Sequence, residues 1–156
     1  MARELDQIDH NILKILQDDG RISNVELAAR VNLSPTPCLE RVRRLERNNY
    51  ILGYAAQLDP HKLKAGFLAF ISVSLDRTTK DVFDRFAKKV REIDEIAECH
   101  MVGGGFDYLL KVRTEDMGAF RRFLGETLSS LPEVSQTHTY FVMEEVKSAT
   151  SLSVPG

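Results

Sequence analysis

The run SPTPCLERVRRLE, residues 34–46, constrains the fold of this chain more than any other segment. Ser34 is a favourable helix N-cap, and Pro35 follows at the first helical position, where its missing N–H leaves no hydrogen bond unmade. The apolar positions then recur at helical spacing until the chain turns polar at Asn48 and Asn49. We therefore expect a capped helix over residues 34–49.

Two further helix signals precede this run. Asp6 can cap a helix that carries apolar residues at every fourth position, Ile8, Ile12 and Leu16, and Gly20 can end that segment in a left-handed conformation. Ser23 and Glu26 then fit an S-x-x-E capping box, and the helix that it starts should end near Asn32, a residue that tolerates a left-handed backbone. A short helix, a tight turn and a capped helix is the spacing of a helix-turn-helix, although a generic helical hairpin shares it.

The angular layout of the 34–49 helix favours nucleic-acid binding. At about 100° per residue, Cys38, Val42 and Leu45 share one face, which we assign to the core. Arginines, a glutamate and a threonine project elsewhere, and the four Arg and two Glu of residues 34–49 give a local net charge of +2. Arginine can bond guanine or hold phosphate, and glutamate can accept from cytosine. The predicted DNA contacts are Ser34, Thr36, Pro37, Glu40, Arg41, Arg43, Arg44 and Arg47.

These contacts divide by expected role. Thr36, Glu40 and Arg43 should lie nearest to base edges, whereas Arg41, Arg44 and Arg47 should mainly contact phosphate. A solvated charged face would have a similar composition. Because a single patch of this size binds weakly, we expect a dimer that presents two.

The segment YILGYAAQLDP, residues 50–60, predicts a short strand or wing followed by a linker. Ile51, Tyr54 and Leu58 are apolar, Gly53 permits a bend, and the run Leu58–Asp59–Pro60 is typical of an exit into a linker. We place a DNA-binding domain with a linker strand in residues 1–60 and a second domain in residues 61–156.

The second half predicts the order βαββαβ, a ferredoxin-like α+β fold with two helices on one face of an antiparallel sheet. Strands are expected at 66–75, 96–102, 106–112 and 137–146, and helices at 78–93 and 115–131. The first strand is apolar at both parities, so we expect both its faces to be covered, one of them by a second subunit. The helical residues expected to point inward are Val82, Phe83, Phe86, Val90, Ile93, Met117, Phe120, Leu124, Leu128 and Leu131.

The run HMVGGGFDYLL, residues 100–110, holds three consecutive glycines between two expected strands. No GxGxxG spacing, following lysine or helix N-terminus accompanies them, which argues against a phosphate loop. A hairpin turn satisfies the geometry, and the third glycine suggests that another chain or a ligand approaches the backbone closely. Asp107 is either a partner for a ligand ammonium group or an acceptor for turn amides.

The remaining chemistry-bearing residues indicate no catalytic or metal site. Cys38 and Cys99 lack a C-x-x-C spacing, and no acid–base partner accompanies Cys99 and His100, so we assign these residues to packing. The net charge of −2 argues against a general polyanion binder. No apolar run reaches the length of a membrane span, and the polar N-terminal residues do not resemble a signal peptide, so we expect a cytoplasmic protein and no enzyme.

Three segments resemble the Lrp/AsnC (feast/famine) family of prokaryotic transcriptional regulators. They are LDQIDHNILKILQDDGRISNVELAARVNLSPTPCLERVRRLE, ECHMVGGGFDYLLKV and LPEVSQTHTYFVMEE, and the similarity extends from Leu5 to about Lys147. The resemblance implies an N-terminal winged helix-turn-helix domain and a C-terminal ligand-sensing and oligomerising domain, often called RAM. It also implies homodimers that assemble further, commonly into octamers, on double-stranded DNA in the nucleoid.

The resemblance further implies a site for an amino-acid effector, such as leucine or methionine, between dimers. By motif this site would contain Met101, Gly103, Gly104, Gly105, Asp107, Tyr108, Met117, Thr139, Tyr140, Phe141 and Val142. Relatives often carry an acidic residue where this chain has Gly105, so a charge and a side chain are missing at the rim of the expected site. The competing function is a nucleoid-type protein that wraps DNA without an effector.

Overall fold

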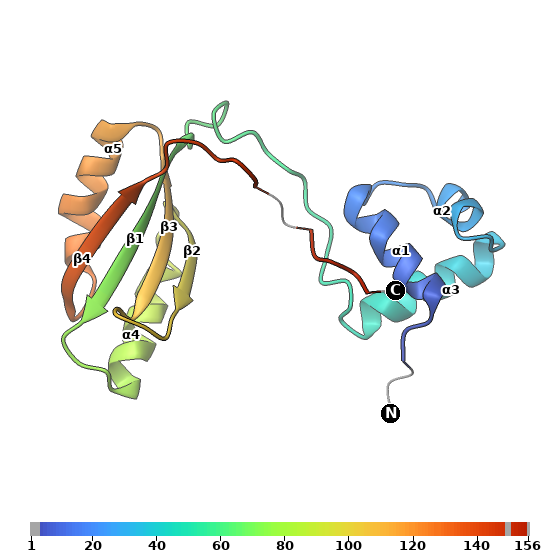
Figure 1. The fold of residues 1–156 in the computed structure, drawn as a ribbon, viewed down its shortest axis with the longest axis horizontal. Helices are drawn as coiled ribbons and strands as arrows, with labels where there is room; N and C mark the ends of the chain where they lie inside the picture. Colours follow the sequence, from blue (N-terminus) through green and yellow to red (C-terminus); the bar gives the residue numbers. More distant parts are fainter. Residues whose placement is uncertain (1–3, 149–150, 156) are drawn as a thin grey trace. The chain divides into compact units, whose positions relative to one another are not determined.

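A computed structural model describes residues 4–148 and 151–155 and divides the chain into two compact units (Figure 1). The first unit contains the described residues of 1–57 and of 147–156, and the second contains residues 58–146. Within the described residues, no helix combines the length and apolarity that a membrane crossing requires.

The C-terminal segment belongs to the first unit, although the sequence placed it with the second domain. Gln17 Nε2 donates to the carbonyl of Leu152 at 3.0 Å, and the Leu152 N–H donates to Gln17 Oε1 at 2.6 Å. This reciprocal pair joins the last described residues to the first helix.

The first unit contains α1 (Gln7–Asp18), α2 (Asn24–Arg30) and α3 (Pro35–Arg47), which confirm the three expected helices. Asp6, Ser23 and Ser34 are their N-caps. A complete capping box forms at α1, where Asp6 and Asp9 each bond the other's N–H. At α2 the box is half formed, because the Glu26 side chain pairs with Arg30 at 2.6 Å.

The turns between these helices follow the sequence only in part. Asn32 ends α2 with φ +56°, as predicted. Gly20, by contrast, does not take a left-handed conformation, and Asp19 is the C-cap of α1. A Cβ at Gly20 would lie 3.2 Å from the Tyr54 ring, so close packing accounts for this glycine.

The predicted strand or wing does not form a strand within the described chain, where residues 52–59 have no regular secondary structure. Leu52 is 91% exposed, and Tyr54 and Leu58 are also largely exposed. The Tyr54 hydroxyl donates to Glu46 at 3.0 Å, and at the end of the segment the Asp59 carboxylate accepts from the His61 N–H at 2.9 Å. A strand in this segment would need a pairing partner that the described chain does not supply.

The core of the first unit matches the expected apolar faces. Cys38 and Leu45 of α3 are fully buried against Ile12 of α1, and Val42 packs beside them. Burial raises the pKa of the Cys38 thiol, in keeping with its role in packing.

The second unit has the predicted order βαββαβ. Its strands are β1 (Phe67–Leu75), β2 (Ile96–Met101), β3 (Tyr108–Thr114) and β4 (Val134–Phe141). They form one antiparallel sheet in the order β2-β3-β1-β4. Helices α4 (Lys80–Val90) and α5 (Met117–Arg122) share a single core with one face of this sheet (Figure 1).

The second expected helix is interrupted. A π-helical turn over Phe123–Thr127 and a 3-10 turn over Leu128–Ser130 follow α5. The shift brings Phe123 into the core beside Phe120, whereas Met117 is 52% exposed. The prediction that Met117 points inward is therefore wrong, because Asp116 caps the helix only one residue earlier and Met117 lies in the open first turn.

At two positions, the outer face of β1 is already covered within the single chain, without a second subunit. Ala69, Ile71 and Val73 face the helices, while Leu68 and Ser72 on the opposite face are also buried. Phe70, between them, is half-buried. Neighbouring strands thus supply part of the cover that the sequence attributed to a partner.

Candidate functional site

The outward face of α3 carries a set of side chains that the fold does not use. Thr36, Glu40, Arg43 and Arg47 are exposed and follow one another at intervals of three or four residues. Within residues 4–148 and 151–155, no hydrogen bond or ion pair engages Arg43 or Arg47. These cations remain available to an external anion.

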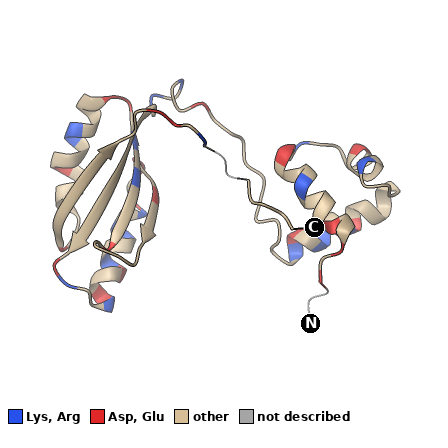
Figure 2. Cartoon of the chain, viewed as in Figure 1, with Lys and Arg blue, Asp and Glu red and all other residues tan. Residues whose placement is uncertain are grey.

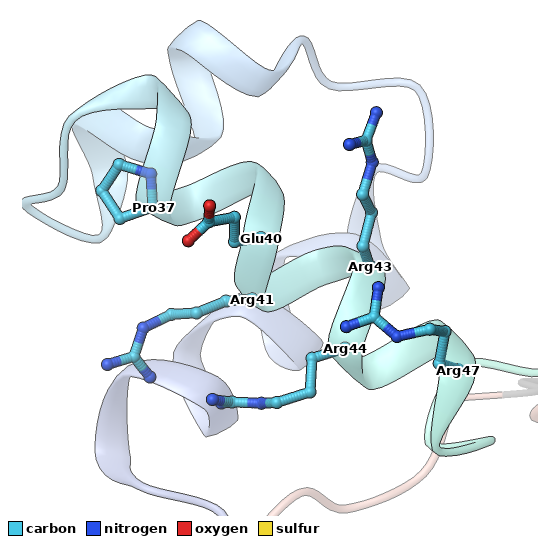
Figure 3. Close-up of a pocket in the computed structure, with 6 residues that line it drawn as sticks. All are labelled: Pro37, Glu40, Arg41, Arg43, Arg44 and Arg47. Atoms are coloured by element: carbon cyan, nitrogen blue, oxygen red, sulfur yellow. The ribbon is translucent and has the colours of Figure 1, made fainter.

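Part of this face is hollowed (Figure 3). The hollow has a volume of about 530 Å³ and is lined by Pro37, Glu40, Arg41, Arg43, Arg44 and Arg47. Ser34 and Thr36 lie at the start of the helix outside the hollow, and the Ser34 hydroxyl makes no capping bond. The structure therefore gathers most of the predicted DNA contacts on one helix surface.

Arg41 and Arg44 differ from Arg43 and Arg47 because they are held within the unit. Arg41 Nη1 donates to Asp6 Oδ2 at 2.7 Å and to Asp9 Oδ1 at 2.8 Å. Arg44 Nη2 donates to both oxygens of Asp9 at 2.7 Å. Figure 3 shows these two side chains leaving α3 on the side away from Arg43.

Asp9 is the centre of this cluster and is only 1% exposed. A buried carboxylate costs several kcal/mol in lost hydration unless it is paired and hydrogen-bonded. The two guanidinium groups and the Asp6 N–H, at 3.3 Å from Asp9 Oδ2, supply those bonds. Acidic and basic residues are accordingly interspersed on α1 and α3 (Figure 2).

Asp6 is the solvent-facing member of the cluster, with 37% of its side chain exposed. The hydrogen bond from Arg41, followed by that from the Asp9 N–H, lowers the pKa of Asp6 from its usual 3.8 to about 2. Arg41 keeps its charge more firmly, because the same bond to Asp6 raises its pKa.

The sequence analysis missed Asp9. The available signal was its position next to Ile8 and one turn before Ile12, on the apolar side of an amphipathic helix. A carboxylate at such a position requires a cation, and the arginines of α3 are candidates to provide one.

The glycine turn confirms the predicted connection between β2 and β3. The Val102 N–H donates to the Asp107 carbonyl at 2.9 Å and closes the turn. None of Gly103, Gly104 and Gly105 has a positive φ, and a Cβ at any of them would meet no atom within 4 Å. Neither backbone strain nor crowding within the chain therefore explains the glycines.

Asp107 is used by the fold. Its Oδ2 accepts from the Leu75 N–H at 2.7 Å, and its own N–H donates to the Val73 carbonyl at 2.9 Å. Of the two roles left open by the sequence, backbone hydrogen bonding is thus observed, with an amide of β1 instead of a turn amide.

The predicted effector residues of β4 lie away from the glycine turn. The segment from Thr139 to Phe141 pairs with Ile71 to Ala69, from the middle of β1 toward its start, and β4 is the sheet edge opposite to β2 (Figure 1). Val142 bonds Leu68 beyond that point. At about 3.3 Å per residue, these groups are roughly 15 Å apart along the strands alone. One chain does not bring them together.

Tyr108 and Met117 occupy different environments from those expected of ligand contacts. Tyr108 is buried, with its ring centre 4.5 Å from that of Phe86, so it packs in the core and cannot line an open site in this conformation. Burial also raises the pKa of Tyr108. Met101, the last residue of β2, and Met117, the first residue of α5, are exposed.

Cys99 follows the packing assignment, whereas His100 does not. Cys99 packs against the core, where burial raises the pKa of its thiol. His100, on the other face of the strand, is exposed, and its Nε2 lies 3.1 Å from Glu98 Oε2. Among the described residues, no group of three or more His, Cys, Asp or Glu side chains could hold a metal ion.

Comparison with known proteins gives consistent matches over nearly the whole chain. Residues 68–152 match the Lrp/AsnC ligand binding domain, and residues 5–51 match a winged helix-turn-helix DNA-binding domain. The leucine-responsive regulatory protein of Escherichia coli strain K12 is 59% identical over 153 residues, which cover 98% of this chain and 93% of that protein.

Two solved structures extend this similarity. A transcriptional regulator from Neisseria meningitidis in complex with L-methionine has 43% identity and a TM-score of 0.91, covering 96% of this chain and 97% of that one. An AsnC family transcriptional regulator from Agrobacterium tumefaciens has 32% identity, the same TM-score and the same coverage.

Replacing Asp9 by Asn should lower the free energy of unfolding of the first unit by about 3–5 kcal/mol, because two partly buried guanidinium groups lose their anion. The matched control is Glu26→Gln, which removes a carboxylate from an exposed pair with Arg30 and should cost less than about 0.5 kcal/mol. Urea unfolding measures both. Equal losses in the two variants would show that burial of Asp9 adds nothing.

Because of Asp6, the free energy of unfolding should depend on pH in the acid range. The pKa of Asp6 is lower in the folded chain than in the unfolded chain. Its contribution to the free energy of unfolding is therefore complete above about pH 3.8 and disappears as the pH falls toward about 2. Wild type should therefore exceed Asp6→Asn in unfolding free energy at pH 6, and the difference should close across this window. A difference that stays constant down to pH 2 would contradict the assignment.

Proposed function

The chain belongs to the Lrp/AsnC family of transcriptional regulators, and from this premise we propose that α3 is the helix through which it reads DNA. It is an effector-responsive DNA-binding regulator and not an enzyme. In the proposed complex α3 enters the major groove, with Thr36, Glu40 and Arg43 nearest to the bases and Arg47 on phosphate.

The observation that carries this proposal is the division among the arginines of α3. Arg43 and Arg47 are exposed and unpaired within the described chain, whereas Arg41 and Arg44 are held by Asp6 and Asp9. A solvated surface helix has no need to separate its cations in this way. The separation leaves one face of α3 with cations free for DNA.

Two such helices are needed for useful affinity, because one presents only a small positive patch. We propose a homodimer, assembling further toward an octamer, on double-stranded DNA in the cytoplasm and nucleoid. The exposed apolar side chains of the 52–58 segment and of the sheet are consistent with this assembly, since isolated chains rarely leave so many uncovered.

The effector site is proposed to form between copies of the chain. The glycine turn lies at the β2–β3 side of the sheet and the Thr139–Val142 segment runs along the opposite edge, so a site that contains both would need a second copy. Glycines without an internal requirement fit this arrangement, because their bare backbone lets another chain or a ligand approach closely.

The proposed effector is an amino acid, with leucine and methionine as the first candidates. Relatives are named leucine-responsive, and a structural neighbour was solved with L-methionine. Because Asp107 already accepts from Leu75, a ligand ammonium group would compete with or share that carboxylate. Binding that alters the contacts between copies would change the spacing of their α3 helices and hence the affinity for an operator.

The double substitution Arg43→Ala/Arg47→Ala should weaken binding to duplex DNA by roughly tenfold or more, since it removes the free cations of α3. A matched control, Arg91→Ala/Arg121→Ala, removes two exposed arginines from the second unit. Gel-shift titration compares the variants. Undiminished affinity in the α3 variant would rule out the groove assignment.

Gly104→Ala should leave the melting temperature unchanged, because a Cβ there meets open space within the chain. The same change should reduce the affinity for leucine or methionine measured by calorimetry, or the size of the assembly measured by light scattering. Ser129→Ala, away from the proposed site, is the control. If wild type binds neither amino acid nor any other in a thermal-shift screen, the effector-independent DNA-wrapping alternative is favoured.

A further inference from the structure

We propose that Asp6 and Asp9 are positioning residues for DNA binding, which fix the rotation of α3 and withhold Arg41 and Arg44 from DNA phosphate. This inference rests on the proposed use of α3 as the DNA-reading helix. It reassigns Arg41 and Arg44, which the sequence alone placed on phosphate. It also gives the acidic start of α1 a part in DNA recognition.

The first step is geometric. At about 100° per residue, Arg41 and Arg44 lie on a flank of α3 between its outer face and its core face. The core face consists of Cys38, Val42 and Leu45. Burial of this face keeps it turned toward the core, but apolar contacts are not directional and leave the exact rotation of α3 less closely defined. A second fixed point on the flank defines that rotation, and with it the side chains that face outward.

The flank is fixed by directional bonds. Arg44 donates to both Asp9 oxygens at 2.7 Å, and Arg41 adds a bond of 2.8 Å to the same carboxylate. Asp9 itself cannot shift readily, since it is buried and its backbone belongs to the first turn of α1. Turning α3 by one residue would break these bonds and leave a charge buried without a partner.

The second step is electrostatic. Arg41 and Arg44 are 21% and 29% exposed, so both could be approached by solvent on the surface of the hollow. Their charges are nevertheless balanced by Asp6 and Asp9, which engage Arg41 through its Nη1 and Arg44 through its Nη2. A phosphate that approaches Arg41 would have to compete with the partly exposed Asp6 for this cation.

The salt dependence of DNA binding separates this role from a merely structural one. Log affinity falls as log salt concentration rises, and each phosphate contact adds about 0.9 to the magnitude of this negative slope, here called the salt slope. The probe is a mixed-sequence duplex of about 40 base pairs, which can hold two half-sites about 10 base pairs apart. The full-length chain is titrated by fluorescence anisotropy over a series of salt concentrations.

Asp6→Asn should raise this slope by up to about 0.9 per α3, because Arg41 loses its exposed partner and becomes able to bind phosphate. The control Glu26→Gln removes a carboxylate from the same unit without freeing an arginine of α3, and its slope should equal that of wild type. Arg43→Gln should lower the slope, whereas Arg41→Gln should not.

Two results would overturn the inference: a slope unchanged by Asp6→Asn, or a loss on Arg41→Gln as large as on Arg43→Gln. Asp6→Asn is suited to the test because the side chain is partly exposed and the asparagine can still cap α1. If Arg43→Gln and Arg47→Gln both leave DNA binding unchanged, the groove assignment itself fails, and that outcome is distinct from the others.

The proposed role of Asp9 in fixing the rotation of α3 is tested separately, by sequence selectivity. The ratio of affinity for a duplex obtained by in vitro selection to that for the mixed-sequence duplex should fall in Asp9→Asn. A folded Asp9→Asn variant with an unchanged ratio would contradict the positioning role. If Asp9→Asn does not fold, Arg44→Gln tests the same bond from α3, and it should lower the ratio without lowering the salt slope.

Discussion

The bond between Arg44 of α3 and the buried carboxylate of Asp9 on α1 is the interaction on which the DNA-binding unit depends. A carboxylate that is 1% exposed must be paired, and the pairing fixes how α3 is turned relative to α1. Arg43 and Arg47 then face outward because of where Arg41 and Arg44 are held. A stability requirement in the core thus determines which cations are presented to DNA.

The second unit in one copy does not bring the predicted effector residues together. Its sheet and helices share a packed core, yet the glycine turn lies at the β2–β3 side of the sheet and the Thr139–Val142 segment runs along the opposite edge. In the proposed assembly, another chain or a ligand that approaches from outside would account for glycines that the single chain does not require. Dependence of the effector site on assembly is also the physical route by which an effector could control DNA affinity.

Much of the fold follows from the sequence because caps and apolar periodicity are local signals. Ser23 and Ser34 occupy the N-cap positions as expected, although only the Ser23 side chain accepts a capping hydrogen bond, and the order βαββαβ is confirmed. Pairing between distant residues leaves weaker signals, so the Asp9 cluster was missed and Arg41 was assigned only to phosphate. Tyr108 and Met117 also show that a local motif does not determine packing. The family motif places both near the effector, but Tyr108 is buried in the core and Met117 is exposed.

The most direct test of this account is the NMR signal of each arginine guanidinium in α3 as duplex DNA is added. The account predicts that the signals of Arg43 and Arg47 shift on binding, while those of Arg41 and Arg44 remain as in the free chain, because Asp6 and Asp9 still hold them. Shifts confined to Arg41 and Arg44, or equal shifts at all these side chains, would contradict it.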